Sequence, residues 1–218
     1  MDSTKQILFE ILKDKDIMIL YEETFFQQIE SINLVSILLE NFDSDNISSQ
    51  CASFEMMQLL LNILSFKQIY QYKSFILNKL STTLICFSQQ VRFTSINFLT
   101  EFYQKCLNNN INLLNEDENF IKNVLNSICL NRYVPVEGIK NNSLKLWKLV
   151  VGNNGIFIIK KNFLTFYDLY VKELGSTSHL TREASCRCLQ ELFMKVYEPS
   201  YKNLIKVRFN YLNRKNFT

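Results

Sequence analysis

The chain has 218 residues, 24 of them basic and 21 acidic, and its net charge of +3 by itself points to neither nucleic acid nor an anionic membrane as a partner. A hydrophobic content of 47% is sufficient for a folded core and excludes a wholly disordered chain. Four glycines and two prolines are too few for the turns of a β-rich chain of this length, so the composition predicts long helices joined by polar loops.

Residues 3–42 are predicted to form irregular helices, and Ser3 and Gln6 have the spacing of a capping box at their start. This N-terminal sequence runs into an amphipathic helix and not into the hydrophobic region of a secretory signal. No apolar run approaches the roughly 18 residues of a membrane span. We therefore expect an intracellular chain, cytoplasmic or nuclear, without a membrane-spanning segment.

The rest of the chain is predicted to consist of helices separated by polar turns. They are expected over residues 47–64, 66–80, 91–107, 120–130, 138–151, 156–174 and 181–193, with a terminal helix over 199–213. Asp45 or Ser48 is the expected N-cap of the first of these helices. The polar stretch 108–119 is the expected long loop, and the Gly-Asn-Asn-Gly sequence at 152–155 is an expected helix stop and turn.

Three of the predicted helices share the same order of residue types. Aligned on their first position, they carry a basic residue at the second position and a serine at the fifth. The aligned residues are Val91, Arg92 and Ser95, then Ile139, Lys140 and Ser143, then Thr181, Arg182 and Ser185. Apolar residues follow five, eight, eleven and twelve positions after the start, so these positions and the serine are predicted to form one buried stripe. The small serine would let a neighbouring helix approach closely, and the basic residue, at the solvent margin, would bridge to a neighbour.

A weaker fourth copy starts at Ala52, without the basic residue and without the serine. The four starts, at residues 52, 91, 139 and 181, are 39, 48 and 42 residues apart. These intervals are close to the roughly 40–47 residues of a two-helix solenoid repeat. The chain is therefore predicted to be built from repeated helix pairs.

The sequences from Val91 and from Thr181, with Arg at the second position and Ser at the fifth, resemble the second helix of a HEAT/armadillo repeat. The resemblance covers about residues 45–195. It implies an all-α fold, a right-handed α-solenoid of stacked helical hairpins with about four to five repeats, in a single domain over residues 1–218. The acidic residue that the family often places before this motif is missing here, so the Asp–Arg ladder of the family is not carried over.

No set of residues predicts a reaction, a cofactor or a metal site, and we expect a non-enzymatic protein. His179 is the only histidine, which excludes sites built on paired histidines. Cys186 and Cys188 lie two residues apart on a predicted helix and point about 200° apart, so they cannot bind one metal ion together. The six cysteines are expected to be reduced thiols, mostly in the core.

The polar stripe of the repeated helices is the candidate binding surface. In HEAT-like stacks the second helices line the concave side, so by resemblance this stripe would face a groove that is mildly basic in its later half. The candidate partner-binding residues are Asn97, Lys140, Lys145, Lys148, Arg182, Arg187 and Gln190. A solvated helix face without a partner is the alternative interpretation.

Protein–protein interaction or scaffolding is the favoured function, because stacked helix pairs leave a long surface without a closed pocket. The alternative is nucleic-acid binding along the basic half, including a HEAT-like DNA-glycosylase enzyme. Such an enzyme needs aromatic residues in the groove, whereas Trp147 occupies an apolar position and is expected in the core. A third interpretation is a subunit of a larger assembly that docks through the terminal helix, which could instead be a simple cap.

Overall fold

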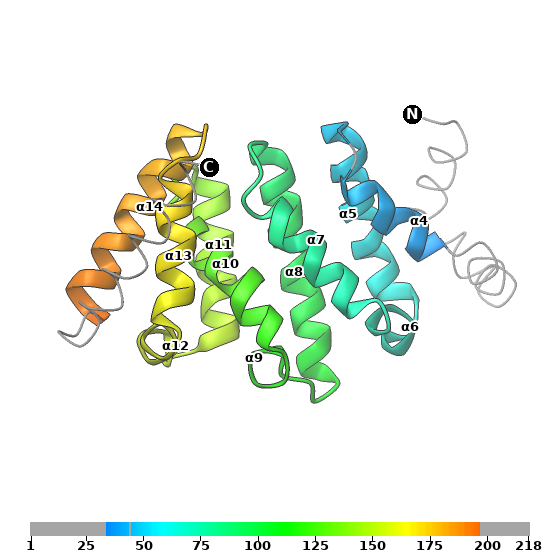
Figure 1. Ribbon diagram of the computed structural model, residues 1–218. Helices are drawn as coiled ribbons and strands as arrows, with labels where there is room; N and C mark the ends of the chain where they lie inside the picture. Colours follow the sequence, from blue (N-terminus) through cyan, green and yellow to red (C-terminus); the bar gives the residue numbers. More distant parts are fainter. Residues whose placement is uncertain (1–33, 44, 197–218) are drawn as a thin grey trace, which may run out of the picture.

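The computed structural model describes residues 34–43 and 45–196, and within these ranges the chain folds into helices without a β-strand. The helices predicted over residues 3–33 and 199–213 lie outside the described residues. Figure 1 shows the described helices side by side in a row, from α4 and α5 at one end to α14 at the other. None of these helices combines the length and the hydropathy needed to cross a membrane.

The helices follow the predicted order, with several interruptions. They are α4 (Leu34–Glu40), η1 (Asn41–Asp43), α5 (Ile47–Ile63), α6 (Phe66–Tyr70), α7 (Lys73–Thr83), α8 (Gln89–Asn108), α9 (Leu113–Glu116), η2 (Phe120–Leu125), α10 (Asn126–Asn131), α11 (Glu137–Val151), α12 (Gly155–Lys161), α13 (Phe163–Glu173), α14 (His179–Glu191) and η3 (Leu192–Val196). The predicted helix 66–80 is divided into α6 and α7, and the predicted helix 156–174 is divided into α12 and α13 at Asn162. The predicted loop at 108–119 contains the short α9.

Polar side chains cap three of the long helices. Asn46 caps α5, so the cap predicted at Asp45 or Ser48 is wrong. The Asn46 side-chain oxygen accepts hydrogen bonds from two backbone N–H groups of the first turn, at 2.9 and 3.2 Å. Ser88 and Ser178 cap α8 and α14, each accepting a hydrogen bond from the backbone N–H three residues further on. The two helices that carry the clearest copies of the motif therefore begin in the same way.

The turn predicted after α11 is confirmed. That helix ends at Val151, and the next residue, Gly152, has a backbone φ of 54°. A side chain is strained in this region of backbone conformations, which explains why glycine stands there.

The helices form two sets that pack against each other. In one set α8 packs between α5 and α11, and in the other α7 packs on η2 and α10 packs on α13. The two sets are joined within hairpins, because α7 contacts α8, α10 contacts α11, and α13 contacts α14. The last repeated helix departs from this order, since α14 packs mainly on α13 and α10. Figure 1 shows α13 between α11 and α14.

The buried stripe of the repeated helices is rotated from the predicted one. The positions at the start and four, seven and eleven residues after it are buried in α8, α11 and α14 with its continuation η3. The position at seven was not predicted, and it holds Phe98, Leu146 and Cys188. The predicted position at five is wrong in two copies, because Leu144 is 41% exposed and Cys186 is exposed. Apolar residue types fit two overlapping stripes, and only the neighbouring helices select one of them.

The three aligned serines are all buried, with no exposed surface. Ser95 donates a hydrogen bond to the Arg92 carbonyl oxygen, and Ser185 donates one to the Thr181 carbonyl oxygen, both at 2.9 Å. The Ser143 hydroxyl has no hydrogen-bond partner. The prediction that small residues occupy the packed face is thus confirmed, and one of the three hydroxyls is buried at an energetic cost.

Replacing Ser143 by alanine is expected to raise the free energy of unfolding by about 1 kcal/mol. The substitution removes a buried polar group without a partner and adds a stronger helix former. Ser143→Leu is expected to lower the free energy of unfolding by about 1–3 kcal/mol because the site is fully packed. Urea unfolding followed by circular dichroism measures both changes. Ser185→Ala is the matched control, and equal losses from Ser143→Ala and Ser185→Ala would contradict the prediction.

Candidate functional site

A groove of about 260 Å³ crosses the exposed side of three consecutive repeated helices, α5, α8 and α11. It is lined by Gln58, Asn97, Thr100, Glu101, Asn142 and Lys145. Gln58, Asn97 and Lys145 each stand six residues after the start of a copy, counted from residues 52, 91 and 139. The repeat thus places one polar side chain from each helix in a common groove.

Two hydrogen bonds join the helices along this groove. The Gln58 amide donates to the Glu101 carboxylate at 2.8 Å, which links α5 to α8. The Asn142 amide donates to the Asn97 side-chain oxygen at 2.7 Å, which links α8 to α11. Lys145 is exposed beside them. Amides offer both donors and acceptors, and the carboxylate and ammonium groups add one charge of each sign.

The structure brings together only part of the predicted binding stripe. Asn97 and Lys145 line the groove, and Lys140 and Lys148 are exposed on the same helix as Lys145. The remaining predicted residues, Arg182, Arg187 and Gln190, are exposed on α14. Because α14 packs on α13 and α10, these three residues do not line this groove.

The two arginines on α14 already have partners within their own segment. Arg182 donates to the carbonyl oxygens of Ser176 and Thr177 at 2.7 and 3.0 Å. Arg187 forms an ion pair with Glu183, one helical turn away, at 2.6 Å. The groove itself contains one lysine and one glutamate, so the mildly basic character expected from the sequence does not describe it.

Thr100 stands nine residues after the start of its copy, at the position of the predicted Lys148 and Gln190, whereas three other groove residues, Gln58, Glu101 and Asn142, were not predicted. Gln58 could have been found, because it occupies the position of Asn97 in the weak copy that starts at Ala52. Glu101 and Asn142 have no equivalent signal. They belong to the groove because they lie opposite Gln58 and Asn97 on the neighbouring helices.

The basic residue of the motif is buried in α8, which corrects the prediction that it lies at the solvent margin. Arg92 is 3% exposed, and its Nε and Nη2 donate to the carbonyl oxygens of Cys86 and Ile85 in the turn before its own helix. Nη2 also donates to the Thr181 hydroxyl at 2.7 Å, and Nη1 donates to the Asn131 side-chain oxygen at 3.5 Å. Burial lowers the pKa of the Arg92 guanidinium from its ordinary value. Arg92 therefore joins the ends of α7 and α10 to the start of α14.

A second buried cluster surrounds Arg132, just after α10. Its guanidinium forms an ion pair with Glu191 at 3.0 Å and lies 4.3 Å from the centre of the Trp147 ring. Trp147 is 8% exposed, which confirms its predicted place in the core. Burial raises the pKa of the Glu191 carboxyl, but Arg132 and the Tyr133 hydroxyl outweigh this effect and hold the pKa below its ordinary value.

The same cluster contains a thiol that departs from the ordinary behaviour of cysteine. Burial raises the pKa of Cys129, but the hydrogen bond from the Cys188 thiol and the charge of Arg132 outweigh this effect. Together they lower the pKa to about 7. Arg132 Nη2 lies 2.7 Å from the Cys129 sulfur. Cys129 is only 1% exposed, so a substrate cannot reach it from solvent. We assign this thiol to the packing of α10 against α14.

All six cysteines are free, as predicted. The expectation of burial is correct for Cys51, Cys106, Cys129 and Cys188, whereas Cys86 is half-buried and Cys186 is exposed. Among the described residues no group of three or more histidine, cysteine, aspartate or glutamate side chains could hold a metal ion. His179 lines a separate groove of about 430 Å³ at the N-terminal ends of α5, α8 and α14.

Comparison with known proteins leaves the family open. No family model matches the chain, and no curated protein matches it. A solved structure described as "TOG-tubulin binding specificity promotes microtubule dynamics and mitotic spindle formation" is similar over 84% of this chain and 80% of its own chain, with 15% sequence identity and a TM-score of 0.47. Values this low identify neither a family nor a function. The helices of the present chain and their packing show by themselves that its described part is an all-helical repeat structure.

Proposed function

We propose that this chain is a non-enzymatic protein-interaction module that binds an extended segment of a partner protein across α5, α8 and α11. The supporting observation is the row of polar side chains that crosses three helices and is held in place by the Gln58–Glu101 and Asn97–Asn142 hydrogen bonds. The architecture that we propose around it is a right-handed α-solenoid of about four to five HEAT/armadillo-like repeats.

The chemistry of the groove suits a peptide backbone. Asparagine and glutamine side chains carry a donor and an acceptor, as the backbone amide of an extended segment does. Lys145 offers a charge-assisted hydrogen bond to an acidic group of the partner, and Glu101 offers one to a basic group. Because the two interhelical hydrogen bonds already order four of the side chains, binding loses less conformational entropy there.

Nucleic-acid binding is the second candidate, since Lys140, Lys145 and Lys148 are all exposed on α11. The carboxylate of Glu101 in the groove opposes this candidate, because it would lie close to phosphate groups. A DNA-glycosylase-like enzyme is disfavoured further, because Trp147 is buried against Arg132 and does not line the groove. Neither Arg182 nor Arg187 adds to a basic surface at this groove.

Affinity purification with the full chain as bait tests the proposal. We expect one or more proteins to be captured by the native sequence and to be depleted by about tenfold or more with the Asn97→Ala/Lys145→Glu variant. Lys67→Glu, the same charge reversal at an exposed lysine of α6, is the matched control and should retain them. Capture that is unchanged in the groove variant would contradict the proposal. Capture that disappears after nuclease treatment or at moderate salt would support nucleic-acid binding instead.

A further inference from the structure

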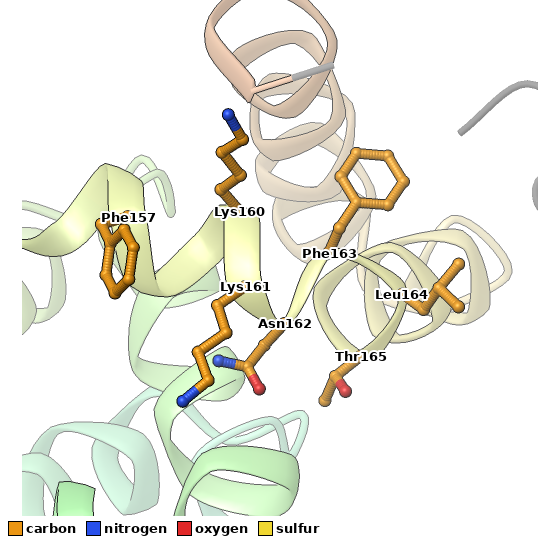
Figure 2. Close-up of a pocket in the computed structure, with 7 residues that line it drawn as sticks. All are labelled: Phe157, Lys160, Lys161, Asn162, Phe163, Leu164 and Thr165. Carbon is orange, nitrogen blue, oxygen red and sulfur yellow. The ribbon is translucent and has the colours of Figure 1, made fainter. Parts of the chain in front are cut away.

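A second and larger groove, of about 590 Å³, lies where α12 meets α13. It is lined by Phe157, Lys160, Lys161, Asn162, Phe163, Leu164 and Thr165, none of which lines the groove across α5, α8 and α11. Figure 2 shows Phe157 on one side and Phe163, Leu164 and Thr165 on the other, with the two lysines extending in opposite directions from the backbone between them. Asn162 closes α12 by donating to the Ile158 carbonyl oxygen at 2.9 Å. The groove thus follows from the break between two helices.

A large apolar side chain is exposed at this groove. Phe157 lines the groove and is 67% exposed, and the preceding residue, Ile156, is 54% exposed but does not line it. Phe163, by contrast, is 3% exposed and forms a buried wall of the groove. Exposed apolar groups gathered beside a concavity are typical of a binding surface. A partner side chain that enters the groove would remove the Phe157 ring from water.

The stretch of chain that forms this groove is basic. Between Glu137 and Asp168 the chain has no acidic residue, although it contains five lysines in that stretch. These lysines are Lys140, Lys145, Lys148, Lys160 and Lys161. Two of them line the groove, and the other three lie on α11, which packs against α12.

Among the described elements, α13 and η3 also pack against α12, and neither adds an exposed acidic side chain. On α13 the charged residues are half-buried Asp168, exposed Lys172 and Glu173, which is only 7% exposed. On η3 the charged residue is Lys195, which forms an ion pair with Glu191 at 3.4 Å. Exposed Lys161 thus places a positive charge at the rim of a groove that has Phe163 as a buried apolar wall.

We propose that the α12–α13 groove binds an acidic segment of a partner protein, which inserts one large apolar side chain beside Phe157 and Phe163. A carboxylate next to that residue pairs with Lys161. The volume lies in the range of about 300–1,000 Å³ that is typical of binding pockets, and a concave site suits an inserted side chain better than a flat lipid surface. Because the two grooves share no lining residue, this proposal does not depend on the one across α5, α8 and α11.

Selection of a phage-displayed random peptide library on the folded full chain tests this proposal. We expect the enriched peptides to carry aspartate or glutamate next to a phenylalanine, tryptophan or leucine. A synthetic, fluorescently labelled peptide of the enriched sequence should bind in anisotropy measurements. Phe157→Ala and Lys161→Glu should each weaken its binding by about tenfold or more.

Two variants serve as matched controls. Phe87, which is 76% exposed in the turn before α8 and does not line this groove, is replaced by alanine, and exposed Lys172 is replaced by glutamate. Both should bind the peptide as the native sequence does, and circular dichroism should show all variants folded. Failure to enrich peptides, enrichment of peptides without acidic residues, or a peptide affinity unchanged in Phe157→Ala would overturn the proposal. Phe157-dependent binding to phosphatidylserine vesicles, with no enriched peptide, would assign the surface to lipid.

Discussion

Replacing Arg92 by alanine is expected to lower the free energy of unfolding by about 3–5 kcal/mol, the range typical of removing one partner from a buried charged network. The substitution leaves the Thr181 hydroxyl, the Asn131 side-chain oxygen and two backbone carbonyl groups without their donor in a buried site. It also separates the start of α14 from the ends of α7 and α10. The loss can be measured by urea unfolding followed by circular dichroism.

Arg182→Ala provides an unusually close control, because Arg182 occupies the same position of the motif as Arg92. It also donates to carbonyl oxygens in the turn before its own helix, but its side chain is exposed. Its replacement should lower the free energy of unfolding by at most about 1 kcal/mol, since water can solvate the carbonyl groups that it leaves. Arg92→Lys should fall between the two, because lysine keeps the charge without the planar fork of donors. Equal losses at both arginines would show that the buried network is not what stabilises the repeat.

Glu191→Gln is expected to lower the free energy of unfolding at neutral pH by about 2–3 kcal/mol. The side chains of Arg132 and Glu191 are 10% and 15% exposed, so the substitution leaves a nearly buried guanidinium without its carboxylate. Arg132 retains its contact with Trp147, which keeps the loss at or below the lower limit of about 3 kcal/mol for buried pairs. Urea unfolding at neutral pH measures this difference.

The same variant should change how stability depends on pH. The pKa of Glu191 is lowered in the folded state, so its contribution is complete above the unfolded pKa of about 4.3 and is lost as pH falls through the folded pKa. The difference between the native sequence and Glu191→Gln should therefore narrow as the solution is acidified. Glu183→Gln, which breaks the exposed pair with Arg187, should change the free energy of unfolding by about 0.5 kcal/mol or less. A difference for Glu191→Gln that is independent of pH would contradict the assigned ion pair.

Much of the local structure could be predicted from residue order alone. The three aligned positions, at residues 91, 139 and 181, each stand two residues inside a helix, and the serine four positions later is buried in every copy. Gly152 ends α11 as expected, and Trp147 lies in the core. These features depend on the helical period, on turn chemistry and on residue size, which act within a few residues along the chain. The sequence was also sufficient to place Asn97 and Lys145 among the candidate binding residues.

Only the tertiary structure decided which residues at equivalent motif positions have equivalent contacts. Arg92 and Arg182 share a motif position, yet one is buried between three helices and the other is exposed. The groove depends on hydrogen bonds between residues 43 and 45 positions apart, and Arg187 lies outside it because α14 packs on α10 and α13. The pattern of residue types predicts the buried face of each helix to within one or two residue positions. The rotation and offset of its neighbours, which come from packing across the whole row, determine what that face meets.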